Sequence, residues 1–428
     1  MHKKTFIDLL FAFLRDKRYC WLKALNTQPA DTAPGSDIDL LIRREDLPSI
    51  LAFARQAPQV SRCRAVHRAS VTYLELYFTD GDYLQVDLLT ALVRKDLEYL
   101  PADYVRANCQ WQNGVATYTP VLLLEHVLLF NFLNGSGLPA KYIRHFEGFP
   151  TAIQQHLLGF LADKYGISVQ AFRQLADFDA VVRNALLRYL AARPENCFPR
   201  RLRNGLRYLS DRLSTAREGR VITFSGVDGA GKTTILNALH TELTEKFRRR
   251  VVVLRHRPSL LPILSAYRYG RAGAEARAAG SLPRQGVNQN RGASLLRFAY
   301  YLFDYLVGQM YVRLRFLARG YVVLYDRYYF DFIADPRRSN LRLGAALPKS
   351  LYRLIAKPDL NIFLYAEPEL ILQRKKELPA ADIRQLTVRY KGLFREFEGR
   401  FAGQYRCLEN KDKAETLHTI VQHYLQTL

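Results

Sequence analysis

The sequence predicts an α/β protein with a C-terminal parallel sheet covered by helices on both faces, a small N-terminal α/β domain and a helical segment between them. From Val221 onward, β-rich apolar runs alternate with helical periodicity, which is typical of a buried parallel sheet. The runs Val71–Phe78 and Tyr83–Leu89 flank an Asp80-Gly81 turn, which is a hairpin signal. Helical periodicity dominates residues 116–215.

Length and composition indicate several domains and an acidic partner. A chain of 428 residues exceeds one ordinary core, so we expect an α/β domain at 1–115, a helical extension with a basic linker at 116–215 and a second α/β domain at 216–428. The balance of 63 Lys+Arg against 40 Asp+Glu gives a net charge of +23. Such a field favours nucleotides, nucleic acid, phosphorylated glycans or anionic lipid headgroups, without choosing among them.

The cysteines and the apolar runs favour a cytoplasmic protein. The five cysteines form no CxxC pair, which argues against a zinc site or a disulfide framework and fits a reducing compartment. The first 18 residues read as an amphipathic helix, because Asp8 interrupts their apolar stretch. We find no uncharged apolar run long enough to span a membrane.

The segment from Gly226 to Thr233 satisfies G-x-x-x-x-G-K-[ST] between an apolar strand and a helical pattern, which predicts a P-loop NTPase sheet. Its glycines let backbone N–H groups turn toward phosphate oxygens. Lys232 would bridge the β- and γ-phosphates of ATP, and the Thr233 hydroxyl would bind Mg²⁺. The expected nucleotide-binding residues are Gly226, Asp228, Gly229, Ala230, Gly231, Lys232, Thr233 and Thr234.

Three ordered motifs in 220–428 resemble thymidylate kinases. They are FSGVDGAGKTT at the loop, GYVVLYDRYY at 320–329 and a segment that begins at Pro358 and ends with Arg374, Lys375 and Lys376. The resemblance implies an ATP- and Mg²⁺-dependent kinase. It implies that Asp326 orients Mg²⁺, that Arg327 holds the acceptor or the transferring phosphoryl group, and that Arg374 belongs to a phosphate-neutralising lid.

The acceptor half departs from that family. The family's R-E-P-G-G-T is replaced by Arg255-His256-Arg257-Pro258, and Tyr305 stands where the family has a base-reading arginine. We therefore expect an acceptor other than thymidine monophosphate, and the arginines at 255 and 257 suggest one that carries negative charge. If the acceptor is a hydroxyl, His256 or Asp228 is the candidate general base.

The N-terminal segment Gly35-Ser36-Asp37-Ile38-Asp39 resembles the G-S-D-x-D signature of nucleotidyltransferases. Alternate strand residues share one face, and Asp87 on a neighbouring strand would complete a metal-binding carboxylate set. The upstream Gly-Gly or Gly-Ser of that superfamily is missing, and Lys23 is a candidate to replace it as a phosphate ligand. An active transferase and a domain that only binds both stay open. We expect Glu125 and His126 on a helix surface.

Residues 200–217 carry six arginines among regularly spaced leucines. A solvated linker helix, an amphipathic helix on anionic membrane at the inner face, and nucleic-acid binding are the alternatives. Nucleic acid is the least favoured, because no known reading module accompanies the charge.

The leading functional hypothesis is a kinase of a small-molecule or glycan acceptor. The pairing of the two resemblances suggests surface-polysaccharide biosynthesis. A regulatory ATPase or nucleotide sensor and an ordinary thymidylate kinase are the alternatives.

Overall fold

The computed structural model describes residues 2–23, 25, 28–29, 36–213, 219–258, 261, 290–374 and 378–428. It divides the chain into two compact units, unit 1 from Met1 to Ala216 and unit 2 from Arg217 to Leu428. Arg217, Lys375 and Lys376 lie outside the described residues. No helix among the described residues has the length and apolar character needed to cross a membrane.

Unit 2 contains a parallel sheet between helices. Within the described residues the sheet has five strands in the order β11-β12-β10-β13-β14, and every pairing is parallel. The strands are β10 (Arg220–Ser225), β11 (Val251–Arg255), β12 (Val322–Asp326), β13 (Leu360–Tyr365) and β14 (Tyr405–Glu409). The helices are α9 (Lys232–Thr241), α11 (Arg291–Arg315), α12 (Phe330–Ala334), α13 (Ala346–Leu351), α14 (Pro368–Arg374), α15 (Ala380–Arg400) and α16 (Lys413–Thr427).

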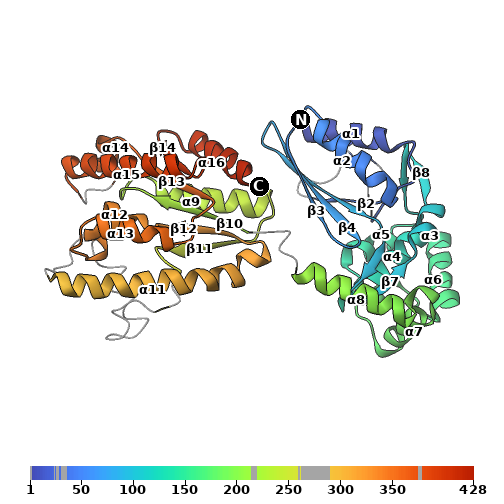
Figure 1. Cartoon of the computed structure of the whole chain (residues 1–428). Helices are drawn as coiled ribbons and strands as arrows, with labels where there is room; N and C mark the ends of the chain where they lie inside the picture. The colour runs from blue at the N-terminus through green and yellow to red at the C-terminus, as the bar shows by residue number, and fades with distance from the viewer. Residues whose placement is uncertain are drawn as a thin grey trace. The chain divides into compact units, whose positions relative to one another are not determined.

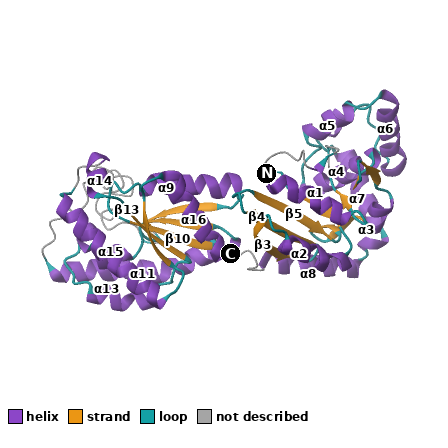
Figure 2. Cartoon of the chain, turned by 90° about the horizontal axis from the view of Figure 1, so that it is seen from above, coloured by secondary structure: helices purple, strands orange, loops and turns teal. Residues whose placement is uncertain are grey.

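Both faces of the sheet of unit 2 are buried, because successive residues of β12 and β13 alternate between the faces and nearly all of them are buried. Val323 and Tyr325 of β12 pack with side chains of α11, α12 and α15 in one aromatic cluster. Figure 2 shows α9 on the other side of the sheet from α11 and α15, and Figure 1 shows the strands in order from β11 to β14. The predicted α/β fold with helices on both faces of a parallel sheet is confirmed for this unit.

Unit 1 contains a mixed sheet with two helical layers. Its described strands run in the order β3-β4-β5-β2-β1-β9-β8, and β6 and β7 form a separate pair. The strands are β1 (Cys20–Trp21), β2 (Ile38–Leu41), β3 (Val60–His67), β4 (Val71–Phe78), β5 (Tyr83–Leu89), β6 (Leu92–Arg94), β7 (Leu97–Leu100), β8 (Gln110–Gln112) and β9 (Val115–Thr117). The helices are α1 (His2–Leu14), α2 (Leu47–Gln56), α3 (Ala102–Ala107), α4 (Pro120–Asn134), α5 (Ala140–Glu147), α6 (Thr151–Tyr165), α7 (Ala180–Ala192) and α8 (Phe198–Leu213).

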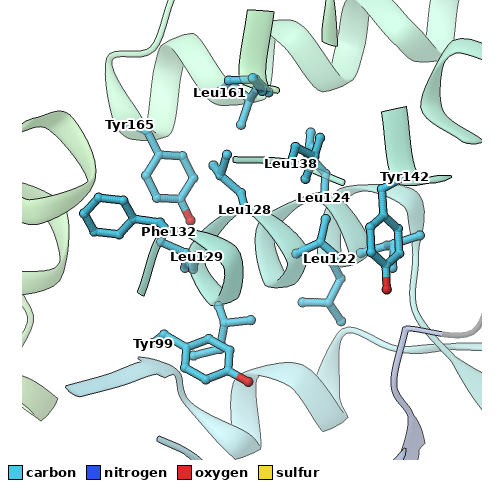
Figure 3. Packing of buried hydrophobic residues seen from close by; sticks show 14 of the residues in the cluster. Tyr99, Leu122, Leu124, Leu128, Leu129, Phe132, Leu138, Tyr142, Leu161 and Tyr165 are labelled. Atoms are coloured by element: carbon cyan, nitrogen blue, oxygen red, sulfur yellow. The ribbon is translucent and has the colours of Figure 1, made fainter. Parts of the chain in front are cut away.

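Helix α4 forms the centre of the helical core of unit 1. Its apolar residues pack with side chains from α5, α6, α7 and β7, and Figure 3 shows its leucines between Tyr99, Tyr142 and Tyr165, with Phe132 beside Tyr165. The expectation that Glu125 and His126 lie on a helix surface is wrong, because neighbouring elements cover α4 and both residues are buried.

Both buried polar groups of α4 have partners, as burial requires. The carboxylate of Glu125 accepts hydrogen bonds from Tyr165 Oη at 2.6 Å and Tyr104 Oη at 3.3 Å, and it pairs with the ammonium of Lys164. His126 Nδ1 lies 2.6 Å from Tyr118 Oη. Burial holds the pKa of His126 well below its usual value, so the ring is a neutral part of the core.

Candidate active site

The phosphate loop joins β10 to α9 and depends on glycine at two crowded positions. Gly226 and Gly231 have φ angles of +152° and +85°, which side-chain-bearing residues rarely adopt. A Cβ atom on Gly226 would lie 2.2 Å from the Leu364 carbonyl oxygen, and one on Gly231 would lie 2.3 Å from Asn410 Nδ2. The backbone of the loop therefore lies directly against β13 and the residue that follows β14.

Lys232 begins α9 and points back over the loop. Its Nζ donates to the carbonyl oxygens of Gly226 at 2.9 Å and Val227 at 2.8 Å. The pKa of Lys232 is lowered to about 7, chiefly by burial and next by the nearby Arg327 guanidinium. The amine of Lys232 thus lies against the backbone of the loop, whose N–H groups bind phosphate oxygens in this motif.

Asp228, inside the loop, is held by two arginines from unit 2. Arg327 Nη2 lies 2.6 Å from its Oδ1, and Arg338 contacts both carboxylate oxygens, with Nη2 3.2 Å from Oδ1. Burial alone would raise the pKa of Asp228, but the adjacent cations, Arg327 foremost, hold it well below its usual value. A carboxylate this weakly basic is poorly suited to remove a proton.

Arg327 follows the end of β12 with a φ angle of +77°. Its backbone N–H donates to the Phe224 carbonyl oxygen at 2.8 Å, which ties it to the strand that leads into the phosphate loop. Its side chain is buried and also bonds to Asp331 Oδ2 at 3.1 Å. A positive φ on a residue with a long side chain costs about 1–3 kcal/mol and persists only where the surroundings hold it.

Sequence reasoning missed Asp331 and Arg338. Asp331 is fully buried, accepts a hydrogen bond from Tyr390 Oη at 2.7 Å and lies 3.9 Å from Arg338 Nε. Asp331 follows Arg327 by only four residues, a separation short enough for the pair to have been anticipated from the sequence. Arg338 carried none, because its carboxylate partner lies 110 residues earlier in the chain.

Thr233 and Asp326 supply the oxygen ligands that suit Mg²⁺. Thr233 is exposed in the first turn of α9. Asp326 is half-buried at the end of β12, in register with Phe224 of β10 and Arg255 of β11. A hydroxyl and a carboxylate that flank the loop at the carboxyl edge of the sheet fit a magnesium ion bound to nucleotide phosphates.

Arg374, the expected lid arginine, lies beside the loop at the end of α14. Its Nη1 is 3.7 Å from the point where a Cβ on Gly231 would stand. The structure thus brings Arg374 together with Lys232, Asp228, Asp326 and Arg327 around the loop, and it adds Arg338.

His256 lies close to this network but has the environment of a neutral core group. Its ring packs against Phe332, and Nε2 lies 3.3 Å from Ser339 Oγ. Its Nδ1 is buried and has no hydrogen-bond partner among the described residues. Burial lowers the pKa of His256 to about 4, against the opposing effect of Asp331, so the ring is a weak base at neutral pH.

Arg257, expected to attract an anionic acceptor, and Tyr305, at the position of the family's base-reading arginine, both have internal partners. Arg257 is buried, and its Nη1 forms an ion pair with Asp304 at 2.8 Å. Tyr305 is buried, and its hydroxyl donates to the His256 carbonyl oxygen. The expectation that Arg257 presents its charge to an acceptor is therefore corrected, because Asp304 neutralises that charge inside the unit. Arg255 is exposed.

In unit 1 the predicted metal-binding carboxylates lie on neighbouring parallel strands. Asp39 of β2 is in register with Asp87 of β5, and Asp37 immediately precedes β2. Lys23 Nζ lies 2.6 Å from Asp39 Oδ2, and Gln85 Nε2 donates to Asp87 Oδ1 at 2.7 Å. No three histidine, cysteine or acidic side chains in the described part of the chain are grouped to hold a metal ion. The expected three-carboxylate cradle is thus not assembled, and an ammonium group balances Asp39.

Known proteins resemble part of this chain. It is 31% identical over 160 residues to a probable thymidylate kinase from Staphylothermus marinus, covering 37% of this chain and 70% of the relative. It is 32% identical over 158 residues to a probable thymidylate kinase from Archaeoglobus fulgidus, covering 37% and 69%. A thymidylate kinase from Enterococcus faecalis is 29% identical over 198 residues, covering 46% and 84%.

Family models and solved structures were also compared with the chain. No protein-family model matches the chain. A crystal structure of thymidylate kinase from Ehrlichia chaffeensis is 19% identical with a TM-score of 0.32, and the match covers 49% of this chain and all of that one.

The matched share of the chain agrees in size with unit 2, which carries the phosphate loop and the GYVVLYDRYY segment at 320–329 that resemble this family. At 31% and 32% identity over 70% and 69% of two relatives, the chain belongs to the thymidylate kinase family and is a P-loop phosphotransferase.

Proposed function

We propose that unit 2 transfers the γ-phosphoryl group of ATP to an acceptor that already carries a phosphate or similar anionic group. The observation that carries this proposal is the convergence of Lys232, Arg327 and Arg338 on Asp228 at the phosphate loop. These three basic side chains come from three separate segments of unit 2, and P-loop kinases gather such side chains where the donor and acceptor phosphates meet. Asp228 keeps the two arginines in place by charge-assisted hydrogen bonds.

The nucleotide would bind through residues 226–234, with Lys232 at the β- and γ-phosphates and Arg374 beside them. Thr233 and Asp326 would hold Mg²⁺, which neutralises phosphate charge and aligns the phosphate oxygens when bound. Arg327 and Arg338 would position the acceptor anion. Positioning and electrostatic stabilisation supply most of the catalysis in this reaction class.

A phosphate acceptor suits this site better than a hydroxyl acceptor. A hydroxyl nucleophile benefits from a general base with a pKa near the working pH. The two candidates do not meet that requirement, because Asp228 is held as a carboxylate by arginines and the pKa of His256 is lowered to about 4. A phosphate oxygen is already ionised at neutral pH and needs no base.

The acceptor we favour is a phosphorylated sugar or glycan intermediate rather than thymidine monophosphate. The base-reading arginine of the resembled family is replaced by Tyr305, which is buried and bonded to the backbone at His256. A site without its polar base reader loses roughly 10⁴-fold of its discrimination. We place the reaction in the cytoplasm, in keeping with five cysteines that form no disulfide.

Thymidine monophosphate is the second candidate acceptor, because the three relatives are named for it. The deciding experiment incubates the full chain with γ-labelled ATP, Mg²⁺ and a panel of nucleoside monophosphates and sugar phosphates. We expect label on a sugar phosphate and none on thymidine monophosphate. Efficient labelling of thymidine monophosphate would establish the second candidate, and ATP hydrolysis that no acceptor stimulates would favour a regulatory ATPase.

For unit 1 we propose a nucleotidyltransferase-like domain that binds its ligand without a two-metal transferase site. Asp39 and Asp87 stand side by side on parallel strands, as the resemblance implies, while the Lys23 ammonium lies against Asp39. Calorimetry of the full chain with Mn²⁺ and each nucleoside triphosphate tests this, using Asp39→Asn/Asp87→Asn as the comparison. A Mn²⁺ site lost in that variant would restore the two-metal transferase.

A further inference from the structure

Helix α8 presents an apolar stripe to solvent. Phe198, Leu202, Leu206 and Leu209 recur at helical spacing and are 77%, 53%, 60% and 50% exposed. Spacings of three and four residues place these side chains on one face of the helix. Isolated exposed apolar residues are ordinary, but a continuous stripe of four marks an interaction surface.

The opposite face of α8 attaches the helix to unit 1 by polar contacts. Arg201 Nη2 lies 2.6 Å from Asp96 Oδ2, and Asn204, which is buried, donates to the Asp96 carbonyl oxygen at 3.4 Å. The Asp211 carboxylate accepts from the Ala69 backbone N–H at 3.1 Å. The usual arrangement of a surface helix is thus inverted, since polar groups face the unit and leucines face away.

Arginines border the apolar stripe. Helix α8 contains five arginines and one acidic residue, Asp211, and that acid turns inward to the Ala69 backbone. The arginines Arg200, Arg203, Arg207 and Arg212 are exposed. A helix with leucines on its outer face, arginines beside them and low mean hydropathy is suited to the plane of a membrane interface.

We propose that α8 docks on the surface of an anionic phospholipid bilayer, with its leucines and Phe198 among the acyl chains and its arginines at the headgroups. Charge complementarity favours this occupant. A second copy of the chain would bring an equally basic helix against the first. On an anionic membrane, by contrast, each arginine raises the partition coefficient of the chain about fivefold. Nucleic acid would meet the arginines but leave the apolar stripe in water.

The test is flotation of the full chain with vesicles of phosphatidylcholine alone or with an equal part of phosphatidylglycerol. We expect flotation only with the anionic vesicles, and its loss at about 1 M salt, where the Debye length is about 3 Å. Leu202→Ser/Leu206→Ser/Leu209→Ser should lower partitioning at least tenfold (about 1.4 kcal/mol), as expected for lost apolar burial. Arg203→Glu/Arg207→Glu should lower it at least as far.

The matched control is Leu296→Ser/Met310→Ser, which removes two comparably exposed apolar side chains from α11. It should float like the unaltered chain, and circular dichroism reports whether each variant is folded. As a measurement that needs no loss of function, Phe198→Trp should show blue-shifted fluorescence with anionic vesicles only. The proposal is overturned if the chain fails to float, if the leucine variant floats unchanged while folded, or if that variant instead converts an oligomer to a monomer.

Discussion

Each unit has acidic side chains in a parallel strand or in the loop that follows one, but different cations balance their charge. At the phosphate loop, Asp228 is contacted by Arg327 and Arg338, each from a different segment of unit 2. In unit 1, Lys23 is the cation that contacts Asp39. Arg327 is 9% exposed, and arginine in a forked contact keeps its charge and its geometry. Lys23 is 26% exposed, and a single lysine contact of this kind is weaker and more readily exchanged. The comparison indicates an organised anion site in unit 2 and an adaptable one in unit 1.

The phosphate loop of the organised site should be the position most sensitive to substitution. Lys232→Ala should lower phosphoryl transfer by about 10³-fold, because one side chain supplies both position and charge at the phosphates. Turnover of labelled ATP with saturating acceptor measures it. Lys246→Ala is the matched control, since Lys246 forms an exposed ion pair with Glu242 on the same unit. Retained activity in Lys232→Ala would remove the phosphate loop from the mechanism.

Asp326→Asn should lower turnover by about 10²-fold and shift the Mg²⁺ concentration for half-maximal rate upward, because a neutral amide is a weaker ligand for the ion or its waters. Magnesium titrations at fixed ATP measure the shift. Asp335→Asn, at a second buried acid of unit 2, serves as the control. An unchanged Mg²⁺ dependence would assign the metal ligand to another residue.

Arg338→Ala should raise the acceptor KM and lower kcat/KM for the acceptor by about 10²-fold, the scale of a charge-assisted contact made to a reacting phosphate. The KM for ATP should change by no more than about threefold, because the donor loop keeps Lys232. Arg337→Ala is the control, since that neighbouring side chain is exposed. Equal losses for donor and acceptor would mean that Arg338 acts only by holding Asp228.

The strands and the phosphate loop could be predicted from sequence because they depend on local patterns. The hairpin expected at Val71–Phe78 and Tyr83–Leu89 forms with those bounds, with Val71 opposite Leu89 and Tyr77 opposite Tyr83. Period-two burial and an Asp-Gly turn specify such a pair without help from the rest of the chain.

The partners of the charged site residues could not be predicted in the same way. Arg257 and Asp304 lie 47 residues apart in sequence, and Asp228 and Arg338 lie 110 apart. Periodicity reports which face of an element is buried, but not which distant side chain meets it there. The surface position predicted for Glu125 was wrong for the same reason, because its partners Lys164 and Tyr165 belong to another helix.

The pH dependence of nucleotide binding tests the lowered pKa of Lys232. Burial lowers its pKa to about 7 from an ordinary 10.5. Between those pH values the unfolded chain binds more protons than the folded one, so the folded state becomes more stable as the pH rises. Bound phosphates favour the ammonium, so the Kd of ADP should rise by up to about tenfold per pH unit above pH ~7. Calorimetry in two buffers should detect proton uptake. In Lys232→Arg, whose charge does not titrate, a flat profile is expected; a flat profile in the unaltered chain would contradict the lowered pKa.

The smallest expected effect concerns the adaptable site of unit 1. Lys23→Ala removes the ammonium that lies 2.6 Å from Asp39 Oδ2, and leaves Asp39 beside Asp87 in the register of β2 and β5. Two neighbouring carboxylates repel each other and attract a divalent cation, so Mn²⁺ affinity should rise by about fivefold, the scale of one exchanged ion pair. The measurement is made in an Asp326→Asn background, so that unit 2 contributes little to the signal. Lys17→Ala breaks a similar pair with Asp46 at 3.0 Å and should leave Mn²⁺ binding unchanged. If Lys23→Ala binds Mn²⁺ no better than this control, the lysine does not take the place of a metal ion, and the carboxylates of unit 1 are structural.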